Sequence, residues 1–79
     1  PELERRVTDR MTHGVLQLSD RELEVLKLVA DGRANKGIAR ALFISEATVK
    51  THLVHIYGKL HTDSRTSAVA AARTHGLIP

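Results

Sequence analysis

The chain has 79 residues, of which 12 are Lys or Arg and 9 are Asp or Glu, so its formal net charge is +3. No apolar run approaches the roughly 20 residues that a membrane-spanning helix needs, which indicates a soluble globular domain with no membrane partner. The chain has no cysteine, which excludes disulfides and thiolate zinc sites, and its two aromatic residues are too few to stack several single-stranded bases.

The positive charge is concentrated in the second half of the chain. Residues 1–32 hold five basic and seven acidic residues, a net charge of −2, whereas residues 33–79 hold seven basic and two acidic residues, a net charge of +5. This asymmetry favours a polyanionic partner such as nucleic acid, although a charged stretch of this kind also occurs as an ordinary solvated surface.

Residues 1–17 are expected to form a linker that consists of a short helix and then a loop. Leu3, Val7 and Met11 recur at helical spacing, and Gly14 lies in a stretch without a helical period. Because the chain begins with Pro1 and not with Met, we expect this linker to follow an N-terminal input or receiver domain.

Residues 18–79 are expected to form the main domain, which begins with two helices. Ser19 and Glu22 form a capping box at the start of the first helix, and Gly32 is placed to end it. A second, shorter helix is predicted over residues 35–42, where Gly37 costs about 1 kcal/mol relative to Ala and makes the helix dependent on tertiary contacts.

Two further helices complete the predicted domain. Ser45 caps a third helix that ends near Leu60, and Ser64 starts a fourth helix that Gly76 stops. No segment alternates with a period of two residues, so the predicted fold class is all-α.

The third helix has a core face and a contrasting outer face. Val49, Leu53, Ile56 and Leu60 share the predicted core face. The opposite face holds small or polar residues and one long cation: Ala47, Lys50, Thr51, Val54 and Gly58. A flank between the two faces carries four hydrogen-bond donors suited to phosphate oxygens: Thr48, His52, His55 and Lys59. With the shorter helix before it, this arrangement is typical of a helix-turn-helix whose second helix enters the major groove.

Several short motifs between Leu18 and Ile78 keep one unbroken register. They read LSDRELEVL at 18–26, NKGIA at 35–39, LFIS at 42–45, TVKTH at 48–52, KL at 59–60, RT at 65–66, AV at 68–69 and HGLI at 75–78. Together they resemble the LuxR/NarL/FixJ-type DNA-binding domain over about three-quarters of the chain.

The resemblance implies a four-helix helix-turn-helix domain, preceded by a linker helix, that binds double-stranded DNA. It implies the cytoplasmic output domain of a transcriptional regulator, most often a two-component response regulator, that acts as a homodimer on inverted-repeat sites and needs no cofactor. RNA polymerase is a further candidate partner. The residues implied to approach base edges are Lys50, Thr51, Val54 and Ala47. Those implied to contact phosphates are Lys36, Thr48, His55, Lys59 and Asn35. The implied dimer interface on the last helix comprises Thr66, Val69, Ala70 and Arg73.

Three positions depart from the pattern of that family. Ala34 stands where a Ser often caps the second helix, and Gly37 stands where Glu is usual, so this helix is expected to be looser or to lie closer to DNA than in relatives. Val54 occupies a position that is often polar, where it can contact a thymine methyl group or simply be tolerated.

Other function classes fit the sequence less well. His52 and His55 are spaced to share a metal ion, but without Cys and with Glu46 as the nearest acid along the helix, no zinc site is expected. The sequence does not indicate an enzyme, because it has no Ser/His/Asp order, no paired carboxylates at plausible spacing and no Gly-rich phosphate loop. The alternatives that remain are a helix-turn-helix module used for protein docking and a sigma-factor-like promoter-binding region.

Overall fold

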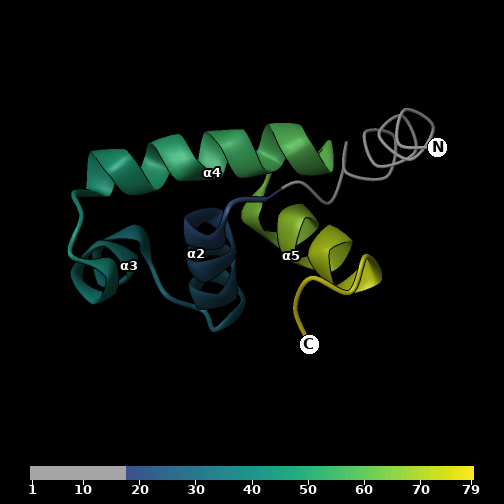
Figure 1. Cartoon of the computed structure of the whole chain (residues 1–79), viewed down its shortest axis with the longest axis horizontal. Coiled ribbons are helices and arrows are strands. Elements are labelled where there is room, and N and C mark those ends of the chain that lie inside the picture. Colours follow the sequence, from purple (N-terminus) through teal and green to yellow (C-terminus); the bar gives the residue numbers. More distant parts are fainter. Residues whose placement is uncertain (1–17) are drawn as a thin grey trace, which may run out of the picture.

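The computed structural model describes residues 18–79, which form four helices (Figure 1). They are α2 (Asp20–Ala30), α3 (Asn35–Leu42), α4 (Glu46–Leu60) and α5 (Arg65–Thr74). No strand occurs in this part of the chain, which confirms the predicted all-α fold with its four helices. The linker and short helix predicted for residues 1–17 lie outside the described residues.

Serine caps start three of the four helices, as the sequence predicts. The Ser19 side chain accepts a hydrogen bond from the backbone N–H of Glu22, and the Glu22 carboxylate accepts one from the backbone N–H of Ser19, which completes the capping box. Ser45 and Ser64 cap α4 and α5 in the same way through their hydroxyl oxygens. These local interactions explain why the observed starts of the three helices agree with prediction.

Helix α3 starts without such a cap, and two helices end at glycine. Ala34 is the N-cap residue of α3 and provides no side-chain hydrogen bond, as the departure at this position predicted. Gly32 and Gly76 follow α2 and α5 with φ angles of +87° and +73°, a region that favours glycine. The predicted ends of these two helices are therefore confirmed.

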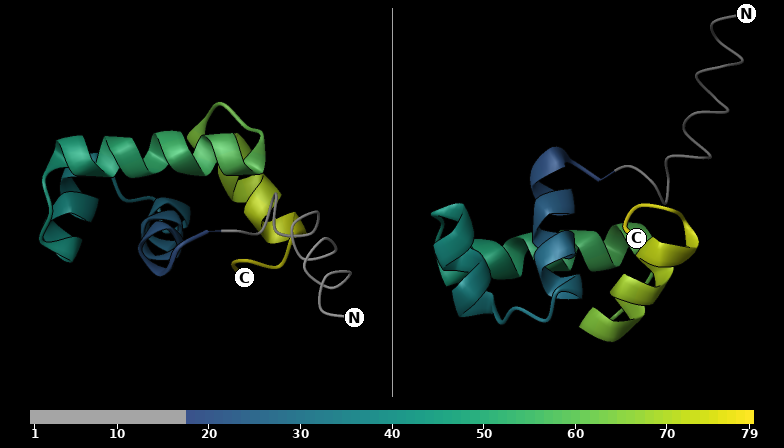
Figure 2. Two further views of the ribbon diagram at one scale, coloured as in Figure 1. Left: turned by 45° about the horizontal axis from the view of Figure 1, so that its top comes forward. Right: turned by 90° about the horizontal axis from the view of Figure 1, so that it is seen from below.

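The helices pack around α4, which is the longest of them. Helix α2 lies under the middle of α4, while α3 and α5 lie near opposite ends of α4 (Figures 1 and 2). Helices α3 and α5 are not among the helix pairs that pack against each other. The core between the helices consists of Val25, Leu26, Val29, Ile38, Ala39, Val49, Leu53, Ile56, Leu60, Ala68, Ala72 and Ile78. No helix within residues 18–79 is long and apolar enough to cross a membrane.

Candidate nucleic-acid interface

The outer face of α4 is exposed along the side that the sequence indicates. The residues predicted to approach base edges, Ala47, Lys50, Thr51 and Val54, are all exposed. The opposite face of the helix is buried in the core through Val49, Leu53, Ile56 and Leu60. This confirms the predicted division of the helix into two faces. The 64% exposure of Val54 leaves an apolar side chain in solvent, where it is free to contact an apolar group of a partner.

Two threonine hydroxyls near the start of α4 already make hydrogen bonds within the helix. The Thr51 hydroxyl donates to the backbone carbonyl of Ala47 at 3.1 Å, so in this rotamer it presents lone pairs to the outside. The Thr48 hydroxyl lies 2.9 Å from the capping hydroxyl of Ser45. Thr51 is therefore poised as an acceptor towards an amino group, whereas Thr48 sits at the capped end of the helix.

Glu22 is the buried charge at the contact between α2 and α4. Only 6% of its side chain is exposed, and one carboxylate oxygen lies 2.7 Å from the Nζ of Lys59. Nδ1 of His55 lies 3.9 Å from the other carboxylate oxygen. Burial raises the pKa of Glu22, but the Lys59 hydrogen bond and charge, together with the bond from the Ser19 backbone, outweigh burial and hold that pKa below its ordinary value.

This arrangement bears on two predicted phosphate contacts, Lys59 and His55. The ammonium group of Lys59 has three donors, so its bond to Glu22 leaves two for a phosphate oxygen. The side chain of His55 is 59% exposed beside the same carboxylate. Both residues face the α2 side of α4, and their contact with phosphate stays a prediction. The acid beside His55 is Glu22 and not Glu46 of the same helix. In the described part of the chain, no three His, Asp or Glu residues are grouped to hold a metal ion.

The start of α3 carries the other predicted phosphate contacts, Asn35 and Lys36. Lys36 is exposed, and Asn35 is half-buried. The side-chain oxygen of Asn35 accepts a hydrogen bond from Nη1 of Arg65 at 2.6 Å. Nη2 of the same arginine donates to the backbone carbonyl of Arg33. The first residue of α5 thus reaches the loop before α3.

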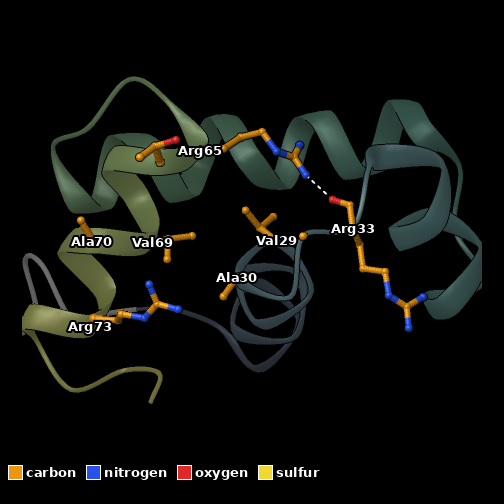
Figure 3. A pocket seen from close by; sticks show the side chains of 9 residues that line it. Val29, Ala30, Arg33, Arg65, Val69, Ala70 and Arg73 are labelled. Carbon is orange, nitrogen blue, oxygen red and sulfur yellow. Dashed lines mark hydrogen bonds between the residues drawn. The ribbon is translucent and has the colours of Figure 1, made fainter.

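The predicted dimer residues form one face of α5, away from the outer face of α4. Thr66, Ala70 and Arg73 are exposed, and Val69 is half-buried against the core. All four line a groove of about 430 Å³ between α5 and the end of α2 (Figure 3). The structure thus brings these residues together on a surface that a second helix could reach.

Glu22 and Arg65 make contacts between helices that were not predicted from the sequence. Glu22 was assigned only to the capping box, although it shares the core face of α2 with Val25, Leu26 and Val29 at helical spacing. A carboxylate on an apolar face requires a buried partner, so the spacing did contain the signal. Arg65 has no comparable local signal, because its partners lie 30 and 32 residues away.

Comparison with known proteins agrees with this geometry. Residues 16–72 match the family described as bacterial regulatory proteins, luxR family. The transcriptional regulatory protein LiaR of Bacillus subtilis is 46% identical over 61 residues, which are 77% of this chain and 29% of LiaR. The response regulator VraR of Staphylococcus aureus is 48% identical over 61 residues, with the same two coverages.

A solved structure extends the similarity to three dimensions. The crystal structure of the response regulator ChrA, of a heme-sensing two-component system, matches with a TM-score of 0.76 and 59% identity. The match covers 77% of this chain and 30% of the ChrA chain. This chain therefore spans less than a third of the length of these relatives. With its four helices and the match over residues 16–72, the chain belongs to the luxR family of bacterial regulatory proteins.

Proposed function

We propose that this domain binds duplex DNA through α4 and serves as the output domain of a transcriptional regulator, specifically a two-component response regulator. The observation that carries the proposal is the outer face of α4, where Lys50 lies exposed among small side chains. A helix of this kind fits the major groove, where Lys can donate to guanine O6 and N7 and short neighbours permit close approach. LiaR, VraR and ChrA, all named as regulatory proteins, support the assignment to a regulator.

Charge and geometry favour DNA over protein docking. Residues 33–79, which contain α3, α4 and α5, have a net charge of +5. Lys36 in the first turn of α3 is exposed, so its ammonium group is free to contact the DNA backbone. Docking onto a protein needs no such excess of positive charge.

The dimer is part of the same proposal. Two copies that meet through Thr66, Val69, Ala70 and Arg73 would each place one α4 in a half-site of an inverted repeat. The exposed face of α5 supports this dimer. A sigma-factor-like region does not need a dimer interface on its last helix, so the face favours the regulator over that alternative.

The test measures binding of the domain to duplexes selected from random DNA, at several salt concentrations. A DNA-binding domain shows a log–log salt slope of about −0.9 for each phosphate neutralised, whereas a flat response indicates protein docking. Lys50→Ala should weaken binding to the selected duplex by about 1–3 kcal/mol and reduce its preference over random DNA.

Lys36→Ala is the matched control because it removes the same charge from a predicted phosphate contact. We expect it to weaken binding to all duplexes alike and to reduce the salt slope by about 1. If Lys50→Ala also leaves the preference for the selected duplex intact, then α4 does not read bases through Lys50.

A further inference from the structure

Arg65 joins two helices that do not otherwise pack together. It is the first residue of α5, and its guanidinium group binds the side chain of Asn35 and the backbone carbonyl of Arg33, at the start of α3. The bond to Arg33 is visible across the groove in Figure 3. Since α3 and α5 make no helix-to-helix contact, Arg65 connects the helix of the predicted dimer face to the first residue of the helix-turn-helix.

These bonds determine which atoms of Asn35 remain available. A guanidinium group can only donate hydrogen bonds, so the atom of Asn35 that it meets must be the amide oxygen. The two N–H donors of the Asn35 amide consequently point away from Arg65. A cation at the oxygen also polarises the amide and makes these N–H groups better donors.

The position needs this support from outside because α3 lacks its own cap. Ala34 has no side-chain oxygen to fix the first turn of the helix. The carbonyl of Arg33, directly before Ala34, is instead held by Arg65. Both the backbone before α3 and the side chain of its first residue are thus fixed by one fork-shaped group, which Lys cannot replace.

We propose that Arg65 is a positioning residue for DNA backbone recognition, which orients the amide of Asn35 to donate to a phosphate without contacting the phosphate itself. This inference rests on the proposed function. It assigns the side-chain amide of Asn35 the role of hydrogen-bond donor to a phosphate. It also means that α5 influences how α3 binds the DNA backbone.

A double-mutant cycle with Arg65→Lys and Asn35→Ala tests the inference on the selected duplex. Each single variant should weaken binding about 3- to 10-fold, because each removes one oriented hydrogen bond. The affinity of the double variant should equal that of whichever single variant binds the duplex less tightly, because both changes remove the same interaction. Losses that multiply would overturn the inference.

Salt dependence separates positioning from direct contact. Arg65→Gln should leave the log–log salt slope of the wild type unchanged, whereas removal of a phosphate-contacting charge reduces that slope by about 1. A reduced slope would show that Arg65 itself binds phosphate and would contradict the proposal. Arg21→Gln, which likewise removes one positive charge but from an exposed position on α2, is the control and should alter neither affinity nor slope.

NMR of the wild-type protein provides a measurement that does not depend on how well a variant folds. In the wild type, the side-chain amide resonances of Asn35 should shift when duplex is added. In the Arg65→Lys variant without DNA, the chemical shifts of the same amide should move towards those of an Asn side chain that has no fixed hydrogen-bond partner. An Asn35 amide that does not respond to duplex would refute its role. If the wild type shows no salt-dependent duplex binding at all, the proposed function fails, whereas binding with an indifferent Asn35 overturns only this inference.

Discussion

Glu22 shows how one buried carboxylate connects α4 to the rest of the domain. One of its carboxylate oxygens, Oε1, accepts hydrogen bonds from both the Ser19 backbone N–H and the Lys59 ammonium group, so a single side chain both caps α2 and anchors α4. Its pKa is lowered in the folded state. A lowered pKa means that the interaction stabilises the fold at pH values above the unfolded-state pKa of about 4.3 and that this stability is lost as the pH falls through the folded-state value.

Lys59→Met should therefore destabilise the domain by about 1–2 kcal/mol at neutral pH, less than a fully buried pair because the Lys59 side chain is 36% exposed. Without the lysine, the pKa of Glu22 should rise, because burial is then opposed only by the hydrogen bonds to Ser19. The deficit should then shrink as the pH falls through the acidic range, because a protonated Glu22 no longer needs a cation. Urea unfolding at several pH values measures this, and a deficit independent of pH would mean that Lys59 contributes only packing.

Phe43 is a residue whose backbone and side chain are both unfavourably placed for stability. Its φ angle is 58°, and its side chain is 93% exposed. The left-handed conformation costs an ordinary residue about 1–2 kcal/mol, and Asn tolerates it better. The turn uses this conformation to end α3, where the N–H groups of Phe43 and Ile44 both bond the carbonyl of Ala39.

Phe43→Asn should raise the free energy of unfolding by about 0.5–1 kcal/mol, since it relieves the backbone and gives up no buried surface. His61→Asn is the matched control, because His61 ends α4 with a φ angle of 56° and is also exposed. Both variants should shift the thermal midpoint upward. A lower midpoint for Phe43→Asn alone would show that the exposed ring contributes to stability through contacts at the turn.

At the scale of the helices, α3 is the element least stabilised by its own sequence. It is eight residues long, has no side-chain cap and contains Gly37. A Cβ atom added at Gly37 would lie 3.8 Å from the nearest atom, Cδ of Arg33, which is ordinary van der Waals contact. The glycine is therefore not required by packing within the domain.

Gly37→Ala should stabilise the domain by about 0.5–1 kcal/mol, and Gly58→Ala in α4 should do so by a similar amount, since nothing lies within 4 Å of its added Cβ. Unfolding followed by helical circular dichroism measures both. Duplex binding then separates the two explanations for Gly37: unchanged affinity indicates that it only loosens α3, whereas weaker binding by the more stable variant indicates close approach to DNA. A loss of stability would contradict the ordinary van der Waals contact found for a Cβ atom at Gly37.

Features that depend on residues within about one or two helical turns were predictable from the sequence. These are the starts of three helices, the ends of two helices at Gly32 and Gly76, and the two faces of α4. The partners of Glu22 and Asn35 were not, because Lys59 and Arg65 lie 37 and 30 residues further along the chain. Helical periodicity indicates which side of a helix is buried, but not which side chain of another helix meets it. The missed part of the candidate site consists of such contacts between elements.

Across the whole domain, the face predicted to read DNA and the face predicted to form the dimer are separate. The start of α4 lies beside α3, and α5 lies at the other end of α4 (Figure 1). The groove beside α5 is lined by three arginines, Arg33, Arg65 and Arg73, and by no acidic residue. A second copy related by a two-fold axis would bring the same positive surface towards it, so such a dimer must depend on close packing of the small residues.

Ala70→Lys should therefore disrupt the dimer, because it adds bulk and a like charge to the face that carries Arg73. We expect cooperative binding to a duplex with two half-sites to fall at least about tenfold, or about 1.4 kcal/mol. Binding to a single half-site should be unchanged or slightly stronger, because the added charge attracts DNA. Ala70→Ser, which keeps the residue small, should preserve cooperativity and serves as the control. Cooperativity that survives Ala70→Lys while the half-site affinity is normal would mean that the two copies meet through a surface other than α5.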